Sequence, residues 1–361
     1  MVLRGRLVLG VLVSAPPDEA LLRLVLHKWA VAEGLDIEVV SGHGDNRPRR
    51  EGRTHVTVLG SPLPPSAMAA LASRIAECSG NIDRIVRLAK YPVTALELDV
   101  SGADPDVLRA ELARVAVQER VDVAVQRGGL ARRAKRLVVM DVDSTLIEGE
   151  VIEELAARAG CLDAVAEITA AAMRGELDFA GSLRARVALL RGLDASALED
   201  VRRSVQLMPG ARTLVRTLKR LGYRIAIVSG GFTQVTDSLR DELGLDFALA
   251  NTLEIGPDGK LTGDVVGPIV DRAGKATALR EFAAAAGVPV ADTVAIGDGA
   301  NDLDMLAAAG LGVAFNAKPV VREQADTAVN VPFLDTILYL LGITRDEVET
   351  ADGEDGFSSA A

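Results

Sequence analysis

Two aspartates follow a short apolar run in the middle of the chain. Residues 137–140 are Leu-Val-Val-Met, and Asp141 and Asp143 come directly after them with one residue between. Such a run is typical of a buried strand, and ligands of open α/β sheets bind at the carboxyl edge of the strands. Carboxylates at this spacing repel each other unless a cation or a shared proton relieves them, so the pair indicates Mg²⁺. The alternative is that both aspartates only cap turns.

Two further predicted strands end in groups that suit phosphate and metal chemistry. Residues 225–228 run into Ser229, Gly230 and Gly231 before a predicted helix, and free backbone N–H groups at a helix N-terminus bind phosphate. An ordinary turn is the alternative for this segment. Residues 294–296 run into a stretch that concentrates polar side chains at the same edge and is far more specific: Asp298, Asn301, Asp302 and Asp304.

Lys275 opens a predicted helix over 275–285, where a cation opposes the helix dipole at a cost of about 0.3 kcal/mol or more. Either it is a surface lysine, or its ammonium neutralises a bound phosphate and a nucleophilic aspartate. The three histidines, His27, His43 and His55, all precede this region. A histidine-based triad there is therefore excluded, and carboxylates must transfer the protons.

Together these segments resemble the haloacid dehalogenase-like superfamily, and Asp-Val-Asp-Ser-Thr with Gly-Asp-Gly-Ala-Asn-Asp looks like its phosphoserine phosphatase branch, over about residues 137–343. The resemblance implies hydrolysis of O-phospho-L-serine to L-serine and phosphate, the last step of serine biosynthesis. Asp141 would be the nucleophile that forms an aspartyl-phosphate, and Asp143 the general acid and base. The phosphoryl group would be held by Ser229, Gly230, Lys275 and Asn301.

The same resemblance implies the metal ligands and the substrate contacts. Mg²⁺ would be bound by Asp141, the backbone carbonyl of Asp143 and Asp298, with Asp302 supporting the metal shell. Substrate recognition would come from a helical insertion, through Glu150, Met173, Phe179 and Arg186. Alternatively, Met173 and Phe179 are plain core residues of that insertion, and Glu150 and Arg186 are solvated helix charges.

The elements that must position these residues are a doubly wound α/β sheet and a helical cap. Strand and helix signals alternate from residue 137 to about 343, the pattern of a parallel sheet of the haloacid dehalogenase-like type. Residues 150–207 carry helical signals and no strand signals, so we expect them to form the cap. The phosphatase domain is predicted to span 137–345, and the acidic tail 346–361 is predicted to be disordered.

A ferredoxin-like (ACT-type) α/β sandwich is expected before the catalytic domain. Residues 53–128 read β-α-β-β-α-β, with strands at 54–60, 81–91, 93–101 and 121–127 and helices at 65–78 and 105–119. This order and residues 79–83 resemble ACT domains, which implies an amino-acid effector, with serine the expected one. Residues 60–64, Gly-Ser-Pro-Leu-Pro, depart from the Asp-x-x-Gly ligand loop of that family.

Residues 1–52 match only the second half of another such unit. The signals there are a strand at 6–14, a helix at 17–33 and a strand at 35–41. A half-unit cannot close its own sheet, and sheet edges of this type are left open, so we expect a homodimer. A basic linker at 129–136 precedes the catalytic domain.

Composition excludes several other classes of protein. The net charge of −11 over 361 residues argues against nucleic acid, and no apolar run is long enough to span a membrane. Two distant cysteines, Cys78 and Cys161, fit a reduced cytoplasmic protein. Gly274-Lys275 resembles the end of a P-loop, but Ile269 and Ala276 break that motif. No Gly-x-Gly-x-x-Gly follows the first strand of the sheet, so a dinucleotide site is excluded too.

Two functional alternatives stay open from the sequence. The chain could be an amino-acid-sensing protein with a vestigial phosphatase domain, although every expected catalytic residue is present. It could also act on another small phosphate such as phosphohomoserine, because Glu150 and Arg186 indicate an amino-acid substrate without setting its length.

Overall fold

The computed structural model describes residues 2–3, 6–7, 18–40 and 52–357. The chain divides into two compact units, Met1–Arg49 and Arg50–Ala361. Within the described residues, no helix is long and apolar enough to cross a membrane. Cys78 and Cys161 are free thiols, and the cytoplasmic location inferred from them stays a prediction.

Within its described residues, the first unit holds two short strands and one helix: β1 (Val2–Leu3), β2 (Arg6–Leu7) and α1 (Glu19–Glu33). Asp18 caps α1 by accepting the backbone N–H of Leu21, and Gly34 ends the helix in the left-handed conformation. The strand predicted at 35–41 is wrong over residues 35–40, which form no strand. A strand needs a neighbour for its backbone groups, and none pairs with 35–40 among the described residues. Residue 41, and residues 8–14 of the strand predicted at 6–14, lie outside the described part.

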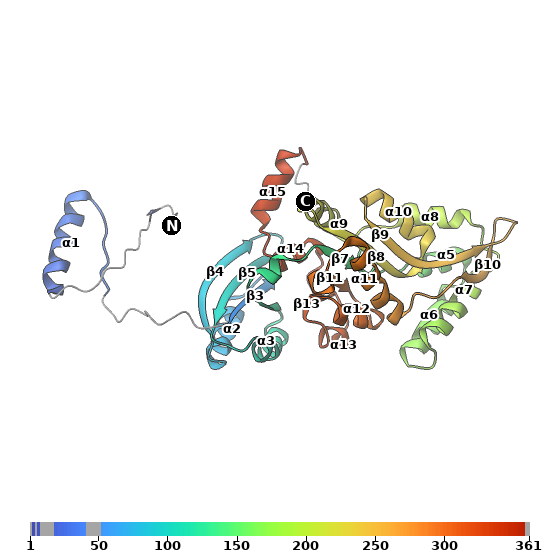
Figure 1. Ribbon diagram of the computed structural model, residues 1–361, viewed down its shortest axis with the longest axis horizontal. Helices are drawn as coiled ribbons and strands as arrows, with labels where there is room; N and C mark the ends of the chain where they lie inside the picture. The colour runs from blue at the N-terminus through green and yellow to red at the C-terminus, as the bar shows by residue number, and fades with distance from the viewer. Residues whose placement is uncertain (1, 4–5, 8–17, 41–51, 358–361) are drawn as a thin grey trace. The chain divides into compact units, whose positions relative to one another are not determined.

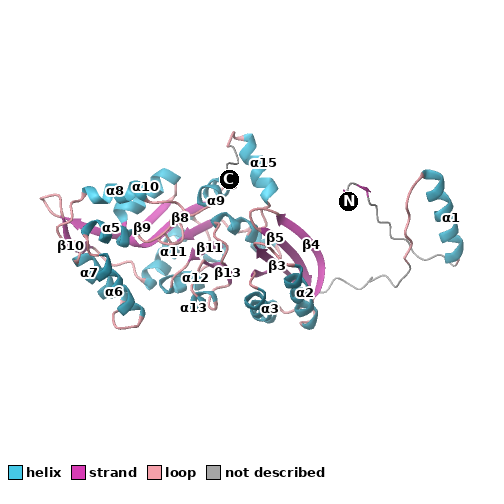
Figure 2. Ribbon diagram, turned by 180° about the vertical axis from the view of Figure 1, so that it is seen from behind, coloured by secondary structure: helices cyan, strands magenta, loops and turns pink. Residues whose placement is uncertain are grey.

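The β-α-β-β-α-β order predicted for residues 53–128 is confirmed. Its elements are β3 (Arg53–Gly60), α2 (Pro65–Glu77), β4 (Asn81–Ala89), β5 (Thr94–Ser101), α3 (Pro105–Glu119) and β6 (Asp122–Arg127). The strands are antiparallel in the order β6-β3-β5-β4. Val56, Val58 and Leu98 point to one face, where α2 and α3 cover them (Figure 2). Side chains alternate along a strand, so the opposite face carries polar residues such as Thr57 and Glu97 together with Leu59 and Ala95, which join the main hydrophobic cluster.

The catalytic part is built on seven further strands, β7 (Leu137–Met140), β8 (Arg224–Phe232), β9 (Phe247–Ile255), β10 (Leu261–Val266), β11 (Thr293–Gly297), β12 (Gly312–Phe315) and β13 (Thr327–Val329). They lie in the order β10-β9-β8-β7-β11-β12-β13, all parallel except β10. Apolar clusters cover both faces, which confirms the doubly wound fold. The helices between the strands are α9 (Ala211–Arg220), α10 (Thr233–Leu243), α11 (Arg272–Ala286), α12 (Leu303–Ala308) and α13 (Pro319–Arg322).

The two sheets join through one edge. Strand β13 pairs antiparallel with β6 at Thr327 and Ala124, so an eleven-stranded sheet runs through both parts (Figure 1). Asp122 reinforces this edge by accepting the backbone N–H and the side-chain amide of Asn330, each at 2.6 Å. The short helix α4 (Leu130–Arg133) forms the connection to β7.

A helical cap interrupts the catalytic part between β7 and α9 (Figure 1). It consists of α5 (Val151–Ala159), α6 (Leu162–Met173), α7 (Phe179–Ala188) and α8 (Ser196–Ser204). The expectation of a helical insertion is confirmed, and the region's strand-like pairing is limited to the isolated bridges Ile147–Leu207 and Asp194–Lys260 in the described residues.

The acidic tail is ordered over most of its length, which corrects the expectation of disorder from residue 346. After α14 (Ile337–Leu340), helix α15 spans Arg345–Glu354 and opens with a capping box between Thr344 and Glu347. Asp352 is buried, and Arg216 of α9 grips its carboxylate with two hydrogen bonds. The acidic composition led to the wrong prediction because the carboxylates of this segment pair with arginines of another helix. Residues 358–361 lie outside the described part.

Candidate active site

Lys275 connects two strand ends from inside the protein. It lies in the first turns of α11, which Asp271 caps by accepting the backbone N–H of Gly274 at 2.8 Å. The Lys275 Nζ donates to Oδ1 of Asp141 at 2.6 Å and to Oδ1 of Asp302 at 2.7 Å, and its side chain is 1 % exposed. Burial alone would lower the pKa of Lys275, but the two carboxylates outweigh it and raise that pKa, so the ammonium stays charged.

Asp141 follows β7 and is held in place by its own backbone, whose N–H donates to the carbonyl of Ile296 at 2.8 Å. Burial and the neighbouring Asp302 raise the pKa of Asp141 well above its ordinary value, and Lys275 opposes that shift. The carboxylate is therefore costly to ionise without another cation nearby.

Asp143 is oriented by the cap and by the end of β8. Its Oδ1 accepts the backbone N–H of Val151, the first residue of α5, at 2.8 Å, and its Oδ2 accepts the hydroxyl of Ser229 at 3.0 Å. Burial raises the pKa of Asp143, and these hydrogen bonds offset only part of the shift. A carboxyl group with a raised pKa can donate a proton to a leaving group.

Asp298 completes a group of carboxylates that fits a hard cation. One oxygen each from Asp141, Asp298 and Asp302 lies within 4.8 Å of the other two. Burial, followed by the charge of Asp302, raises the pKa of Asp298 to about 7. Three carboxylates face one ammonium here, and oxygen ligands of this kind are those that Mg²⁺ prefers. The donor set therefore suits a divalent cation.

The Ser-Gly-Gly segment is an irregular end of β8 rather than a turn before a helix. Strand β8 continues to Phe232, with a register shift against β9 between Val228 and Phe232, and α10 begins at Thr233. Ser229 is fully buried, and its hydroxyl oxygen accepts the backbone N–H of Gly231 at 2.7 Å. A Cβ at Gly231 would lie 2.9 Å from Oδ2 of Asp143, so only glycine permits this approach.

Phe179 brings the cap onto the same segment. A Cβ at Gly230 would lie 2.9 Å from Cζ of the Phe179 ring, so the ring packs directly on the glycine backbone. Phe179 is partly buried and packs against the main hydrophobic cluster. Asn301 lies in the 3₁₀ turn Ala300–Asp302 after β11, half-buried beside Gly299.

Glu150 and Arg186 lie near enough to shift each other's pKa. Burial, then Asp143, raises the pKa of Glu150, whereas Arg186 lowers it. Burial lowers the pKa of Arg186, and Glu150 and Asp143 oppose that shift. The guanidinium Nε donates weakly to the carbonyl of Ser182 at 3.4 Å. Both residues are partly buried rather than solvated. Met173 ends helix α6, and its side chain lies outside the described part.

Two residues near the centre were not assigned a role from the sequence. Asn251, on β9, is 1 % exposed; its amide donates to the carbonyl of Gly230 at 2.8 Å, and its oxygen accepts the backbone N–H of Val270 at 2.8 Å. Thr145 donates to Oδ1 of Asp298 at 3.4 Å. Thr145 was part of the Asp-Val-Asp-Ser-Thr motif, but nothing around Asn251 in the sequence signals its contacts.

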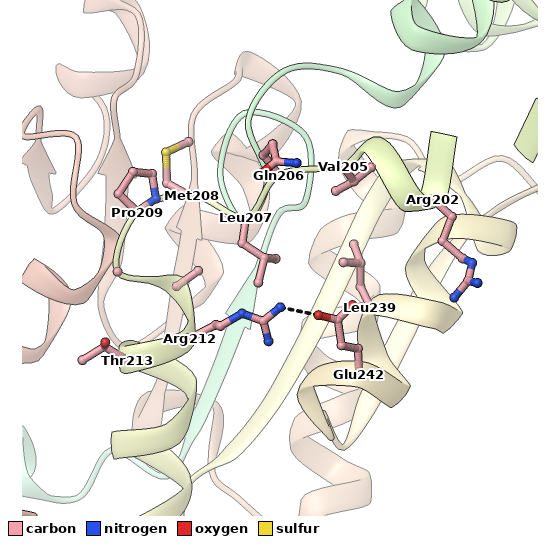
Figure 3. A pocket seen from close by; sticks show the side chains of 12 residues that line it. Arg202, Val205, Gln206, Leu207, Met208, Pro209, Arg212, Thr213, Leu239 and Glu242 are labelled. Atoms are coloured by element: carbon pink, nitrogen blue, oxygen red, sulfur yellow. Dashed lines mark hydrogen bonds and ion pairs between the residues drawn. The ribbon is translucent and has the colours of Figure 1, made fainter. Parts of the chain in front are cut away.

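A surface pocket of about 360 Å³ lies elsewhere on the catalytic part (Figure 3). It is lined by residues of α8, α9 and α10 and by the segment 205–210, and an ion pair between Arg212 and Glu242 crosses it. None of its lining residues belongs to the centre around Asp141. The carboxylate centre is therefore separate from this pocket.

Comparison with known proteins agrees with this arrangement. The model of the haloacid dehalogenase-like hydrolases matches residues 138–307, and that of an ACT domain matches residues 53–126. A phosphoserine phosphatase of Streptomyces coelicolor is 69 % identical over 98 % of this chain and 86 % of its own length. The chain belongs to the haloacid dehalogenase-like hydrolases.

Two further members of this hydrolase family are similar to the chain. A phosphoserine phosphatase of Mycobacterium tuberculosis is 56 % identical over 98 % of this chain and 88 % of its own length. A solved structure described as a phospho-aspartyl intermediate analogue of phosphoserine phosphatase is 43 % identical, with a TM-score of 0.54, over 57 % of this chain and 98 % of that chain. The second relative covers little more than half of this chain.

Proposed function

We propose that the protein hydrolyses O-phospho-L-serine to L-serine and phosphate, the last step of serine biosynthesis, through an aspartyl-phosphate on Asp141. The observation that carries the proposal is the buried Lys275, which holds the carboxylates of Asp141 and Asp302 at 2.6 and 2.7 Å. This contact fixes the Asp141 carboxylate at the sheet edge, where an incoming phosphoryl group meets it. The names of the similar proteins support the substrate.

In the first step, an oxygen of Asp141 attacks phosphorus in line, and the bond from phosphorus to the serine oxygen breaks. Asp143 gives its proton to the leaving oxygen, a role that its raised pKa and its hydrogen bonds from Val151 and Ser229 support. In the second step, Asp143 takes a proton from the water that attacks the aspartyl-phosphate. Phosphate leaves and Asp141 is regenerated.

The remaining residues hold charge in place. Lys275, Ser229, Asn301 and the backbone N–H groups after Ser229 bind the phosphoryl oxygens. Asp141, Asp298 and the backbone carbonyl of Asp143 would hold Mg²⁺, with Asp302 supporting them. When bound, the ion supplies Lewis-acid stabilisation of the developing charge.

The cap recognises the amino-acid part of the substrate in this proposal. Arg186 binds the α-carboxylate, Glu150 pairs with the α-ammonium, and Phe179 and Met173 close the site around the carbon chain. The packing of Phe179 on Gly230 supports its place beside the phosphoryl-binding segment.

The ACT domain indicates a small-molecule effector, for which we propose serine, in a homodimer. Support for dimerisation is the edge strand β4, which pairs with β5 alone among the described residues and could pair with a second copy. A monomeric mass in light scattering at micromolar concentration would count against it.

The test is turnover of a panel of phosphate esters with Mg²⁺ and with EDTA. We expect the highest kcat/KM for phosphoserine, loss of activity in EDTA, and radioactive phosphate on Asp141 after acid quenching. A higher kcat/KM for phosphohomoserine than for phosphoserine would contradict the proposed substrate, but it would leave the aspartyl-phosphate mechanism unchanged. Turnover without any acid-stable protein label and unaffected by EDTA would overturn the mechanism.

A further inference from the structure

A second group of metal-binding side chains lies on the ACT domain, away from the reaction centre. His55 on β3 stands directly opposite Asp99 on β5, and Glu97 is two residues before Asp99 on the same face of the sheet. The Nδ1 of His55 lies 2.8 Å from Oδ1 of Asp99 and 3.7 Å from Oε1 of Glu97. One ligand atom from each of the three residues lies within 4.8 Å of the other two. The ring nitrogen therefore faces two carboxylates at once.

The second oxygen of Glu97 is held by an arginine from outside the domain. Arg132 of α4 lies with Nη2 at 2.5 Å from Oε2 of Glu97; the Arg132 side chain is buried, at 7 % exposure, and the Glu97 side chain is partly buried, at 13 %. The Nε of Arg132 also donates to the carbonyl of Leu340 at 3.1 Å, which fixes the guanidinium. Partners of this kind commonly orient carboxylate ligands of metal ions. Oε1 of Glu97 is thus left facing His55.

A buried hydroxyl lies on the same face of the sheet. Thr57 is two residues after His55 and stands opposite Glu97 in the strand register. Its side chain is fully buried, and Oγ1 has no hydrogen-bond partner among the residues that the structure describes. Buried hydroxyl groups normally find a partner, so this one indicates a polar group, such as a bound water, on this face of the sheet. The observation is independent of the three ligands.

We propose that His55, Glu97 and Asp99 bind a divalent transition-metal ion of the zinc type. The two carboxylates and the Arg132 guanidinium sum to one negative charge, which attracts a cation. Imidazole nitrogen with carboxylate oxygen suits Zn²⁺ and its neighbours better than Mg²⁺. Three protein ligands leave a position for water, to which the Thr57 hydroxyl is adjacent in the strand register.

The proposed ion sits where the ACT domain meets the catalytic part. Besides Arg132, Gln126 of β6 connects the two, because its side-chain amide donates to the carbonyl of Leu340 at 2.8 Å. Gln126 stands opposite His55 in the strand register. An ion bound to His55, Glu97 and Asp99 would cross-link β3 and β5 beside this junction and stabilise it. Its chemistry differs from that of the reaction centre, whose carboxylate group contains no histidine.

The test uses the full chain stripped of metal with EDTA. Zn²⁺ is titrated by calorimetry into the wild type, His55→Ala and His27→Ala, the last being the same substitution at an exposed histidine of α1. We expect His55→Ala to bind one equivalent fewer than the other two proteins. Equal stoichiometry in all three proteins would overturn the proposal, because any Zn²⁺ uptake would then belong to the carboxylate centre around Asp141.

A second measurement does not depend on how well His55→Ala folds. The chain has three histidines, so imidazole NMR signals are few. In the wild type, Zn²⁺ should shift the His55 ring signal, and Asp99→Asn should weaken the affinity followed by that signal about tenfold or more. A His55 signal that does not move at saturating Zn²⁺ would show that the histidine only cross-links the strands by hydrogen bonds, and the proposal would fail.

Discussion

Lys275 of the reaction centre contacts two carboxylates directly, whereas Glu150 and Arg186 of the cap influence each other without a hydrogen bond or ion pair between them in the described residues. In the centre, one ammonium already pairs by direct contact with two of the three carboxylates before substrate arrives. The cap pair stays partly buried with opposite charges that nothing on the cap neutralises by contact. Such a pair is suited to a ligand that carries both charges, as the amino and carboxylate groups of an amino acid do.

The difference predicts two classes of variant. Changes in the centre should damage turnover of any phosphate ester, because they act on the phosphoryl group itself. Changes in the cap should damage only substrates with an amino-acid head group. Each variant is therefore measured on phosphoserine and on a simple aryl phosphate.

The largest expected effect is that of Asp141→Asn. The amide cannot attack phosphorus and is a poor metal ligand, so essentially all turnover of both substrates should be lost while the fold remains. The matched control is Asp304→Asn, the same change at a surface aspartate that pairs with Arg272. Appreciable activity in folded Asp141→Asn protein would contradict the proposed nucleophile.

Lys275→Met should come next and should again affect both substrates alike. The substitution removes the buried ammonium from Asp141 and Asp302, and loss of one such donor typically lowers kcat by about 10²- to 10³-fold. Lys260→Met, at an exposed position beside the turn at 257–258, is the control. A loss confined to phosphoserine would mean that Lys275 acts in recognition, and the comparison between centre and cap would fail.

The reaction centre was predictable from the sequence because strand ends fix it. Asp141, Ser229 and Asp298 each follow a short apolar run in the sequence, and parallel strands bring their carboxyl ends to one edge. The contact of Lys275 with Asp141 could be expected once that edge was recognised, whereas its contact with Asp302 was not predicted. The role of Asn251 was not predicted, because its contacts with Gly230 and Val270 depend on tertiary packing alone.

Other parts were less predictable for physical reasons. Helix α15 looked like a disordered tail, since its pairing with Arg216 and Arg220 joins residues more than 130 positions apart. The strand expected at 35–41 had the right apolar pattern, but a pattern does not supply a neighbouring strand. The group around His55 gave no signal either, because its three ligands meet only through the register of β3 and β5.

Arg186→Ala tests most directly whether the cap acts on substrate recognition rather than on the reaction centre. The guanidinium can grip the α-carboxylate with two hydrogen bonds worth roughly 2 to 4 kcal/mol, which corresponds to a loss of about 30- to 1,000-fold in kcat/KM for phosphoserine. The aryl phosphate should change much less. Arg184→Ala, an exposed position on the same helix, is the control. Equal losses on both substrates would mean that Arg186 supports the cap fold or the centre.

The dependence of metal affinity on pH should report on the centre alone. The pKa of Asp298 is raised to about 7, so below that pH the carboxyl group must lose a proton before it can bind a cation. The affinity for Mg²⁺ should therefore fall as the pH decreases below about 7, by up to tenfold per pH unit. Calorimetric titrations between pH 5 and 8 measure this slope, since this range extends about 2 units below that pKa and about 1 unit above it. The same dependence of Mg²⁺ affinity on pH should be found in Arg186→Ala. Its loss in that variant would mean that Arg186 of the cap influences the metal site.

The smallest expected effect is that of Glu150→Gln. Glutamine keeps an oxygen that can accept a hydrogen bond from the α-ammonium but loses the charge, so kcat/KM for phosphoserine should fall by roughly 5- to 20-fold, about 1 to 2 kcal/mol. Aryl phosphate hydrolysis should stay close to that of the wild type. Glu153→Gln, one turn along α5 and exposed, is the matched control.

The pH profile gives Glu150→Gln a second readout. Burial and the nearby Asp143 raise the pKa of Glu150, so its carboxyl group takes up a proton at a higher pH than an exposed glutamate would. In the wild type, the preference for phosphoserine over the aryl phosphate should then decline as the pH falls through that raised pKa. Glutamine does not titrate, so the same ratio in Glu150→Gln should stay flat over this range. A ratio that declines equally in both proteins would assign the titration to another group, and Glu150 would not be the partner of the α-ammonium.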